Sequence, residues 1–184
     1  VVIMDPLLGG ALAAPPDPVR TLFDQTGNGV SPVDYAFRWL WDKDDVGTVL
    51  SGMSSMEQVT DDVAYASSAC AANGAACLTE PERTAFKAAK ERYEAMRPVP
   101  CTTCGYCMPC PHGVDIPENF TILNKWYMFG DEREARMRYN KMLPEENRAS
   151  ACIECGECLP KCPQQIPIID SLKRVRSELE TAIA

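Results

Sequence analysis

The sequence predicts a mainly α-helical chain that opens with two strand–helix (βα) units and closes with a cysteine-rich helical region. Three observations support this prediction. Short apolar, β-branched segments occur at 1–4 and 46–50, and each is followed by turn residues and a helix signal. Apolar residues recur at helical spacing over much of the remaining chain. Eight of the ten cysteines fall in two short runs, 101–110 and 152–162.

Length and charge narrow the classes of function. The 184 residues are enough for one domain or two small ones. A net charge of −8 argues against a nucleic-acid-binding surface, and no apolar run approaches the ~20 residues of a membrane span. Reduced thiols favour a reducing compartment, so a cytoplasmic location is expected. The chain opens on Val1 without an initiator methionine and is expected to begin inside a larger protein.

The first βα unit is predicted over residues 1–41. The segment 1–4 has the character of a buried parallel strand. Prolines and turn residues then predict a loop over 11–30. Ser31 as N-cap and Pro32 as the first helical residue begin a helix. Its apolar face is formed by Val33, Ala36, Phe37, Leu40 and Trp41.

The second βα unit is predicted from the strand at 46–50 onward. Ser55 and Gln58 form a capping box at the start of its helix. We expect this first domain to span 1–78, followed by a bridging helix over 79–97 and a second domain over 98–184. In the linker before the bridging helix, Cys70 and Cys77 are expected to be small packed thiols.

The two cysteine runs have the spacing of iron–sulfur ligands. Each has three cysteines at three-residue steps and a fourth followed by proline, the pattern of two-cluster proteins in which the fourth cysteine ligates the other run's cluster. One [4Fe-4S] cluster is therefore expected on Cys101, Cys104, Cys107 and Cys162, and a second on Cys152, Cys155, Cys158 and Cys110. The first run departs from the bacterial pattern, because two residues instead of three precede its last cysteine.

Structural zinc and disulfides are two other uses of closely spaced cysteines. Structural zinc also uses paired C-x-x-C motifs, but a site of four ligands gains nothing from a third cysteine three residues further on. A disulfide scaffold is disfavoured by the tight, regular spacing and by the absence of a signal-peptide pattern. Iron–sulfur ligation, with electron transfer as its function, is the favoured interpretation.

Helices are predicted around and between the runs. One begins at Pro117 and ends at Gly130, and a charged helix over 131–143 ends before Pro144. The last helix carries an apolar stripe of Ile169, Leu172, Val175, Leu179 and Ile183. His112, the single histidine, is either an incidental polar residue or a hydrogen-bonding neighbour of a cluster.

Longer stretches resemble a known family. VVIMDPLLGGALA and DYAFRWLWDKDDVGTVLSGMSSMEQVTDDVAYAS look like the last two βα units of an aldo/keto reductase (βα)8 barrel. PCTTCGYCMPCPHGVDIP and CIECGECLPKCPQQIPI resemble the α-helical ferredoxin-type extension of one subgroup. The resemblance implies an incomplete barrel followed by a two-cluster domain, from an NAD(P)-linked oxidoreductase. The family's catalytic Asp, Tyr, Lys and His lie on strands that this sequence lacks, so no catalytic residue is assigned.

The resemblance also implies nucleotide contacts and partners. Residues 52–62, with Gly52 and Ser54, match the segment that holds the adenosine end, although NADP-selective members carry Lys and Arg there. The same residues read equally well as an ordinary helix N-terminus. NAD(P) would bind only with the missing barrel portion. The expected partner is that portion or a redox protein. The alternative function is an iron–sulfur subunit of a multi-subunit complex, resembling those of succinate dehydrogenase or heterodisulfide reductase.

Overall fold

The computed structural model describes residues 1–71 and 78–180. The chain divides into two compact units, Val1–Arg92 and Tyr93–Ala184. The division lies inside helix α4 (Glu80–Met96), within the predicted bridging helix. The predicted domain limits at 78 and 98 stay predictions. So does the packing of Cys70, Cys77 and Ile183, whose side chains lie outside the described part.

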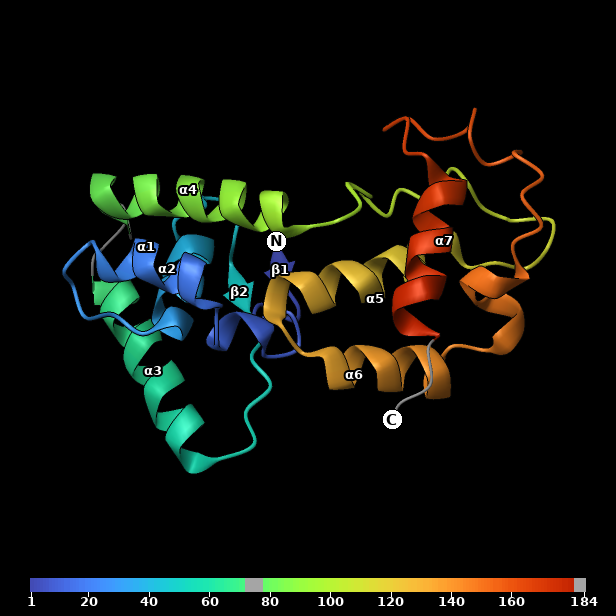
Figure 1. Cartoon of the computed structure of the whole chain (residues 1–184). Coiled ribbons are helices and arrows are strands. Elements are labelled where there is room, and N and C mark those ends of the chain that lie inside the picture. Colours follow the sequence, from blue (N-terminus) through green and yellow to red (C-terminus); the bar gives the residue numbers. More distant parts are fainter. Residues whose placement is uncertain (72–77, 181–184) are drawn as a thin grey trace. The chain divides into compact units, whose positions relative to one another are not determined.

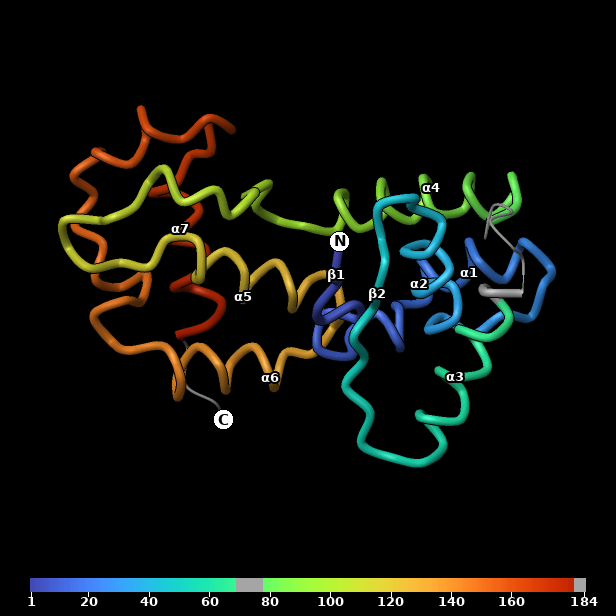
Figure 2. Tube along the Cα trace, turned by 180° about the vertical axis from the view of Figure 1, so that it is seen from behind, coloured from blue at the N-terminus to red at the C-terminus, as the bar shows by residue number. Residues whose placement is uncertain are grey.

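The first unit contains a pair of short parallel strands. Strand β1 (Val2–Ile3) lies beside β2 (Thr48–Val49), with Val2 opposite Thr48 and Ile3 opposite Val49 (Figure 2). The two predicted strands are therefore confirmed, although each is shorter than its apolar segment. No third strand occurs in the described part of the chain, so a barrel remains a hypothesis that rests on the resemblance.

The prediction of a loop over 11–30 is wrong in part, because the segment contains a 3-10 turn η1 (Ala11–Ala13) and the helix α1 (Asp17–Asp24). The prediction treats the prolines as helix breakers. Pro16 instead occupies the N-cap position, and Pro18 lies in the first helical turn. At these positions a fixed φ suits the helix and the missing N–H has no partner to lose.

Helices α2 (Pro32–Trp41) and α3 (Met56–Ala71) pack together and begin at the predicted caps (Figure 1). The hydroxyl of Ser31 accepts the Asp34 N–H at 3.1 Å. Ser55 and Gln58 form a reciprocal capping box, with bonds of 3.2 and 3.3 Å between each side chain and the other residue's N–H. Both predicted helix starts are thus confirmed.

A buried carboxylate ties α4 to α2 in the first unit. Glu82 is 0% exposed, and its carboxylate accepts from Arg38 Nη2 at 2.7 Å and from Asn28 Nδ2 at 3.0 Å. The N–H and hydroxyl of Thr79 donate to it at 2.7 and 2.9 Å. Burial alone would raise the pKa of Glu82, but the bonds from Arg38 and Thr79 outweigh it and lower the pKa to about 2.

Helices α5 (Ile116–Phe129), α6 (Glu132–Met137) and α7 (Ile168–Leu179) form the framework of the described part of the second unit. Helix α5 lies beside α6, and α7 packs across α5 (Figure 1). Helix α5 ends at Gly130, whose φ of 77° suits glycine and whose N–H donates to the Trp126 carbonyl. The predicted limits of α5 are confirmed.

The charged helix predicted over 131–143 is not α-helical throughout. After α6 it widens into a π-helical turn, η2 (Arg138–Met142), in which the Leu143 N–H reaches the Arg138 carbonyl at 3.0 Å. Two 3-10 turns, η3 (Glu145–Asn147) and η4 (Ala149–Ala151), then lead to the second cysteine run. Within the described residues, no helix combines the length and apolar character that a membrane span needs.

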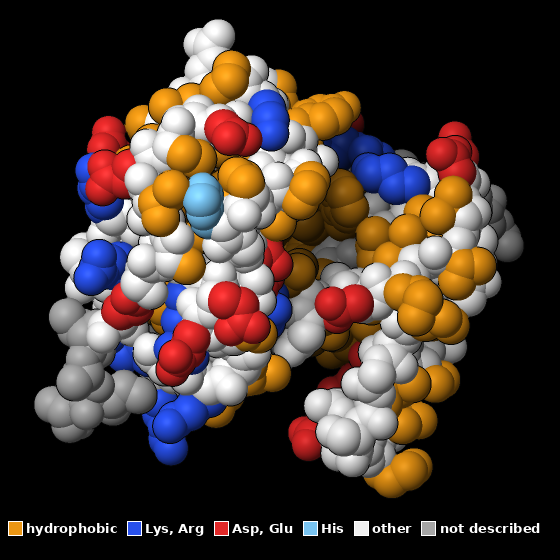
Figure 3. Space-filling view, turned by 90° about the vertical axis from the view of Figure 1, so that its right-hand side faces the viewer, with side chains coloured by type: hydrophobic (Ala, Val, Ile, Leu, Met, Phe, Trp, Pro, Cys, Tyr) orange, Lys and Arg blue, Asp and Glu red, His pale blue; other side chains and the backbone are white. Residues whose placement is uncertain are grey.

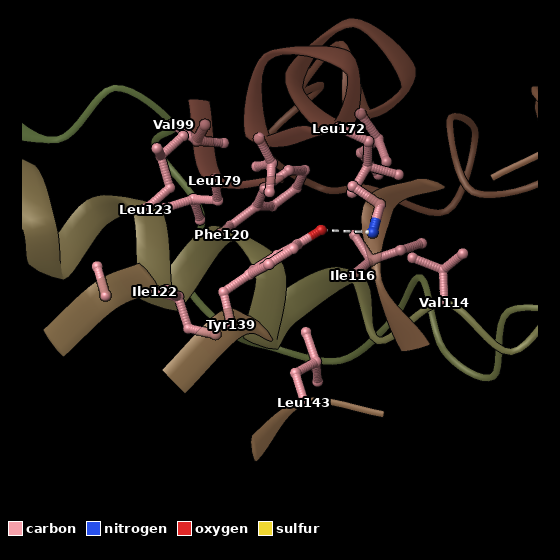
Figure 4. Close-up of a cluster of buried hydrophobic side chains, with 14 of the residues drawn as sticks. Val99, Val114, Ile116, Phe120, Ile122, Leu123, Tyr139, Leu143, Leu172 and Leu179 are labelled. Atoms are coloured by element: carbon pink, nitrogen blue, oxygen red, sulfur yellow. Dashed lines mark hydrogen bonds between the residues drawn. The ribbon is translucent and has the colours of Figure 1, made fainter. Parts of the chain in front are cut away.

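The core of the second unit gathers side chains from α5, α6, η2 and α7 and from the segments that flank both cysteine runs (Figure 4). Tyr139 is fully buried, and its hydroxyl accepts the Ala149 N–H at 2.9 Å and donates to Glu180 at 2.7 Å. The core members include Val99, Val114, Ile116, Phe120, Leu123, Tyr139, Ile166, Ile168, Leu172 and Leu179, and six of the eight run cysteines pack against it.

Candidate metal centre

The first three cysteines of each run lie in loops with matching backbone conformation. Thr103 and Glu154, each two residues after the first cysteine, have φ values of 55° and 61°. Gly105 and Gly156 follow with φ values of 78° and 82°, a region that favours glycine. Each glycine carbonyl accepts a bond from the N–H three residues on, at 2.9 and 3.1 Å. The spacing of the cysteines therefore corresponds to one loop that occurs twice.

The repeat continues beyond the cysteines. The backbone carbonyl of the fourth cysteine in each run accepts a hydrogen bond from the N–H three residues further on. The donors are Gly113 to Cys110 at 3.0 Å and Gln165 to Cys162 at 3.1 Å. Helices α5 and α7 then begin at corresponding residues, Ile116 and Ile168. The cysteine spacing does not by itself reveal this longer repeat. Its signal is the pattern C-P-x-x-[VI]-x-I at 110–116 and 162–168.

One hollow of about 330 Å³ lies against the first run. Its lining includes Cys101, Cys104, Cys107 and Cys162, together with the apolar Ile116, Pro117, Phe120, Ile166 and Ile168. Apart from cysteine, none of the described residues that line it is ionisable. The Thr103 N–H donates to Cys101 Sγ at 3.4 Å. The structure thus brings together the four residues that were predicted as the first ligand set.

A second hollow of about 390 Å³ lies against the second run. It is lined by Cys110, Cys152, Cys155 and Cys158, by the apolar Val114, Ile116, Ile169 and Leu172, and by the ionisable His112, Glu157 and Lys161. Cys107 borders this hollow as well as the first. Figure 3 shows the face that carries the single histidine, surrounded mainly by hydrophobic and uncharged atoms.

Burial keeps the inner thiols protonated when no metal is bound. It raises the pKa of Cys107 to about 11 and also raises the pKa values of Cys101 and Cys158. Neighbouring cysteines add to the effect, Cys162 on Cys101 and Cys110 on Cys158. Each fourth cysteine is therefore close to the other run. Metal binding has to displace these protons, as thiolates are the ligands.

The arrangement fits a group with several metal atoms better than a single ion. Among the described residues, no three His, Cys, Asp or Glu side chains are placed to hold one metal ion. A zinc ion would need four sulfur atoms about 2.3 Å from one point. The cysteines instead lie around two hollows, whose largely apolar walls suit an iron–sulfur cluster.

The two residues predicted as nucleotide contacts are placed differently. Gly52 lines a hollow of about 1320 Å³ in the first unit, between the loop after β1, the loop after β2 and α3. Ser54 is not among the lining residues. Its N–H and hydroxyl both donate to Gln58 Oε1, at 2.7 and 3.2 Å, so it belongs to the helix cap. Nucleotide binding by either residue stays a prediction.

Comparison with known proteins identifies one region. Residues 100–166 match the model of the 4Fe-4S dicluster domain. This range includes all eight cysteines of the two runs. No curated protein and no solved structure matches the chain.

Proposed function

Because residues 100–166 are a ferredoxin-type iron–sulfur domain, we propose that this chain transfers electrons through two [4Fe-4S] clusters. One would be held by Cys101, Cys104, Cys107 and Cys162, and the other by Cys110, Cys152, Cys155 and Cys158. The observation that carries the proposal is that each of these sets lines a hollow of its own. A bound cluster accepts and donates single electrons, and its potential depends on hydrogen bonds, charge and solvent around it.

The residues around the cysteines have distinct roles in this proposal. Ile116 and Phe120 from α5 and Leu172 from α7 are almost fully buried and would keep water from the inner side of the sites. The Thr103 N–H would stabilise the thiolate of Cys101. Cys104 and Cys155 are the exposed cysteines of their runs, so a redox partner would approach each site from this side.

Anaerobic reconstitution tests the proposal. We expect about eight iron and eight sulfide per chain, and reversible reduction in a redox titration followed by EPR. About two zinc ions per chain without sulfide would overturn the proposal. If the clusters bind but cannot be reduced reversibly, electron transfer is contradicted and the clusters have a structural role only.

Serine variants test the ligand sets. Cys110→Ser and Cys155→Ser should impair the same cluster, and Cys104→Ser and Cys162→Ser should impair the other. The matched comparison is between Cys110→Ser and Cys104→Ser, which change the same run. If these two variants lost the same EPR signal, the fourth cysteines would not be exchanged between the runs.

We further propose that the chain is the C-terminal part of an aldo/keto reductase-like oxidoreductase. The parallel strands β1 and β2 support this, because ligands of such folds bind beyond the carboxyl ends of the strands. The hollow that includes Gly52 lies there, between the loops that follow the two strands. Asp5, Asp61 and Asp62 line it, and the described lining residues include no Lys or Arg. This charge favours NAD over NADP, whose 2′-phosphate needs a cation.

Two observations would separate this parent protein from an iron–sulfur subunit of a larger complex. Coding sequence upstream of Val1 should specify the missing βα units. The 184-residue chain alone should reduce no carbonyl compound with NADH or NADPH. Turnover by the purified chain would contradict the assignment, since the family's catalytic residues are absent from the sequence.

A further inference from the structure

The two halves of the metal centre differ at one pair of corresponding positions. Glu154, in the second cysteine loop, corresponds to Thr103 in the first loop. Lys173, in the first turns of α7, corresponds to Thr121 in α5, because both lie five residues after the first residue of their helix. The second half therefore carries an acid and a base where the first half carries two threonines.

The acid and the base meet in the structure. Lys173 Nζ lies 2.8 Å from Glu154 Oε2, and both side chains are 55% exposed. The pair joins α7 to the loop between Cys152 and Cys155. Glu154 has the largest effect in raising the pKa of Lys173, and Asp170 and then Cys152 add to it. The pair therefore lies in the immediate electrostatic surroundings of the second hollow.

Other charges do not cancel this difference. Arg97 and Arg148 each lie four residues before the first cysteine of their run, so both halves have an arginine at this position. Glu157 and Lys161 line the second hollow and have opposite charges. Replacing only Lys173 would remove the cation that the structure pairs with Glu154, and the remaining neighbour Asp170 is also an acid.

We propose that the two clusters are electrically inequivalent and that Lys173 is a positioning residue, which sets the potential of the second cluster by neutralising and holding Glu154. The inference rests on the proposed function. An unpaired carboxylate beside a cluster disfavours the added electron and lowers its potential. An unpaired lysine has the opposite effect. The corresponding positions beside the first cluster are Thr103 and Thr121, so that cluster should respond to neither change.

Potentiometric titration followed by EPR, on the reconstituted full chain, measures this directly. Lys173→Met should move one reduction wave to lower potential, and Glu154→Gln should move the same wave to higher potential. Because both side chains are exposed, the loss of one partner is expected to change the reduction equilibrium of the cluster about two- to fivefold. The double variant should lie close to the unaltered chain, and the shifts should shrink at high salt. A purely structural role would show no opposite signs and no salt dependence.

Two matched variants identify the wave and control for the helix. Thr103→Glu places an unpaired acid at the corresponding position of the first loop and should lower the other wave. Arg174→Met, at the next position on α7, breaks an ion pair with Glu178 (2.6 Å) and a bond to the Tyr127 hydroxyl (2.9 Å), and neither partner belongs to a cysteine loop. It should move neither wave.

The outcomes separate the inference from the function on which it rests. A chain that binds no iron and sulfide contradicts the proposed function. A chain with two reducible clusters in which Lys173→Met and Glu154→Gln shift in the same direction, or not at all, contradicts only the inference. Movement of the same wave by Lys173→Met and Thr103→Glu would also overturn it. Iron content, measured for every variant, shows whether a shift comes from cluster loss.

Discussion

Asn124 is the buried link between α5 and the segment that enters the first cysteine loop. Its Oδ1 accepts the Val99 N–H at 3.1 Å, and its Nδ2 donates to the Val99 carbonyl at 2.8 Å. Val99 is 1% exposed and Asn124 is 6% exposed, so water cannot easily replace these bonds. Asn124→Leu removes both bonds while keeping a side chain of similar size.

The cost follows from the Val99 N–H, which loses its partner, whereas the Val99 carbonyl keeps its bond from the Cys101 N–H at 2.8 Å. A buried group left unpaired costs about 1–3 kcal/mol, and the added apolar contact of leucine offsets part of this cost. We expect the free energy that holds this segment closed to fall by about 1–2 kcal/mol. Since every 1.4 kcal/mol is a factor of ten, opening near Cys101 should become about 5- to 30-fold more frequent.

The measurement is the rate at which a chelator removes iron from the reconstituted chain, followed by the loss of cluster absorbance. Thr121→Val is the control on the same helix, because it removes only the bond from the hydroxyl to the Pro117 carbonyl. Asn124→Leu should accelerate iron loss strongly and Thr121→Val by less than threefold. Equal rates for the two variants would refute the reasoning.

Three further predictions concern stability. Because the pKa of Glu82 falls from 4.5 to about 2 on folding, its stabilisation is fully present above pH 4.5 and disappears as the pH falls toward 2. At about 1.4 kcal/mol per pKa unit this amounts to about 3 kcal/mol, and urea unfolding of Glu82→Gln should show a flatter acid dependence. Tyr139→Phe leaves the buried Ala149 N–H without its partner and should cost about 1–3 kcal/mol; unchanged hydrogen exchange at Ala149 would disprove this. Gly113→Ala should be more destabilising than Gly130→Ala in thermal unfolding, as both have φ near 80° but only at Gly113 would the added Cβ lie 3.2 Å from the Glu146 carbonyl. Equal losses would mean that the close approach is unimportant.

Local signals explain which helices could be predicted from the sequence. The capping box of Ser55 and Gln58 and the stop at Gly130 depend on residues within one turn, so sequence alone suffices. The helix α1 was missed for the converse reason. A proline breaks a helix in its interior but favours its first turn, and only the position of Pro16 and Pro18 relative to the helix start decides between these effects.

The candidate site was predictable in its cysteines and not in its walls. The spacing of the cysteines alone predicts the two sets of four ligands, because three thiolates at three-residue steps can hold one cluster. The apolar walls depend on how α5 and α7 follow each run. Ile116 borders both hollows, and along the chain only its place in the repeated segment after Cys110 marks it. The charge that distinguishes the second half, Lys173, lies 15 residues after Cys158 and becomes relevant only through its contact with Glu154.

The repeat has a consequence for how the metal centre forms. If the ligand sets are as proposed, neither half can complete a set by itself, since each contributes three cysteines to one hollow and one to the other. Ile116 and Cys107 also border both hollows. Losing one cluster would therefore free a cysteine of the run that holds the other cluster. It would also loosen the wall that the two hollows share. The features that the halves share, the glycines at positive φ and the helix starts, position the cysteines of both sites. Glu154 and Lys173 are not needed for this and differ from the threonines of the first half, so they can make the two sites electrically different.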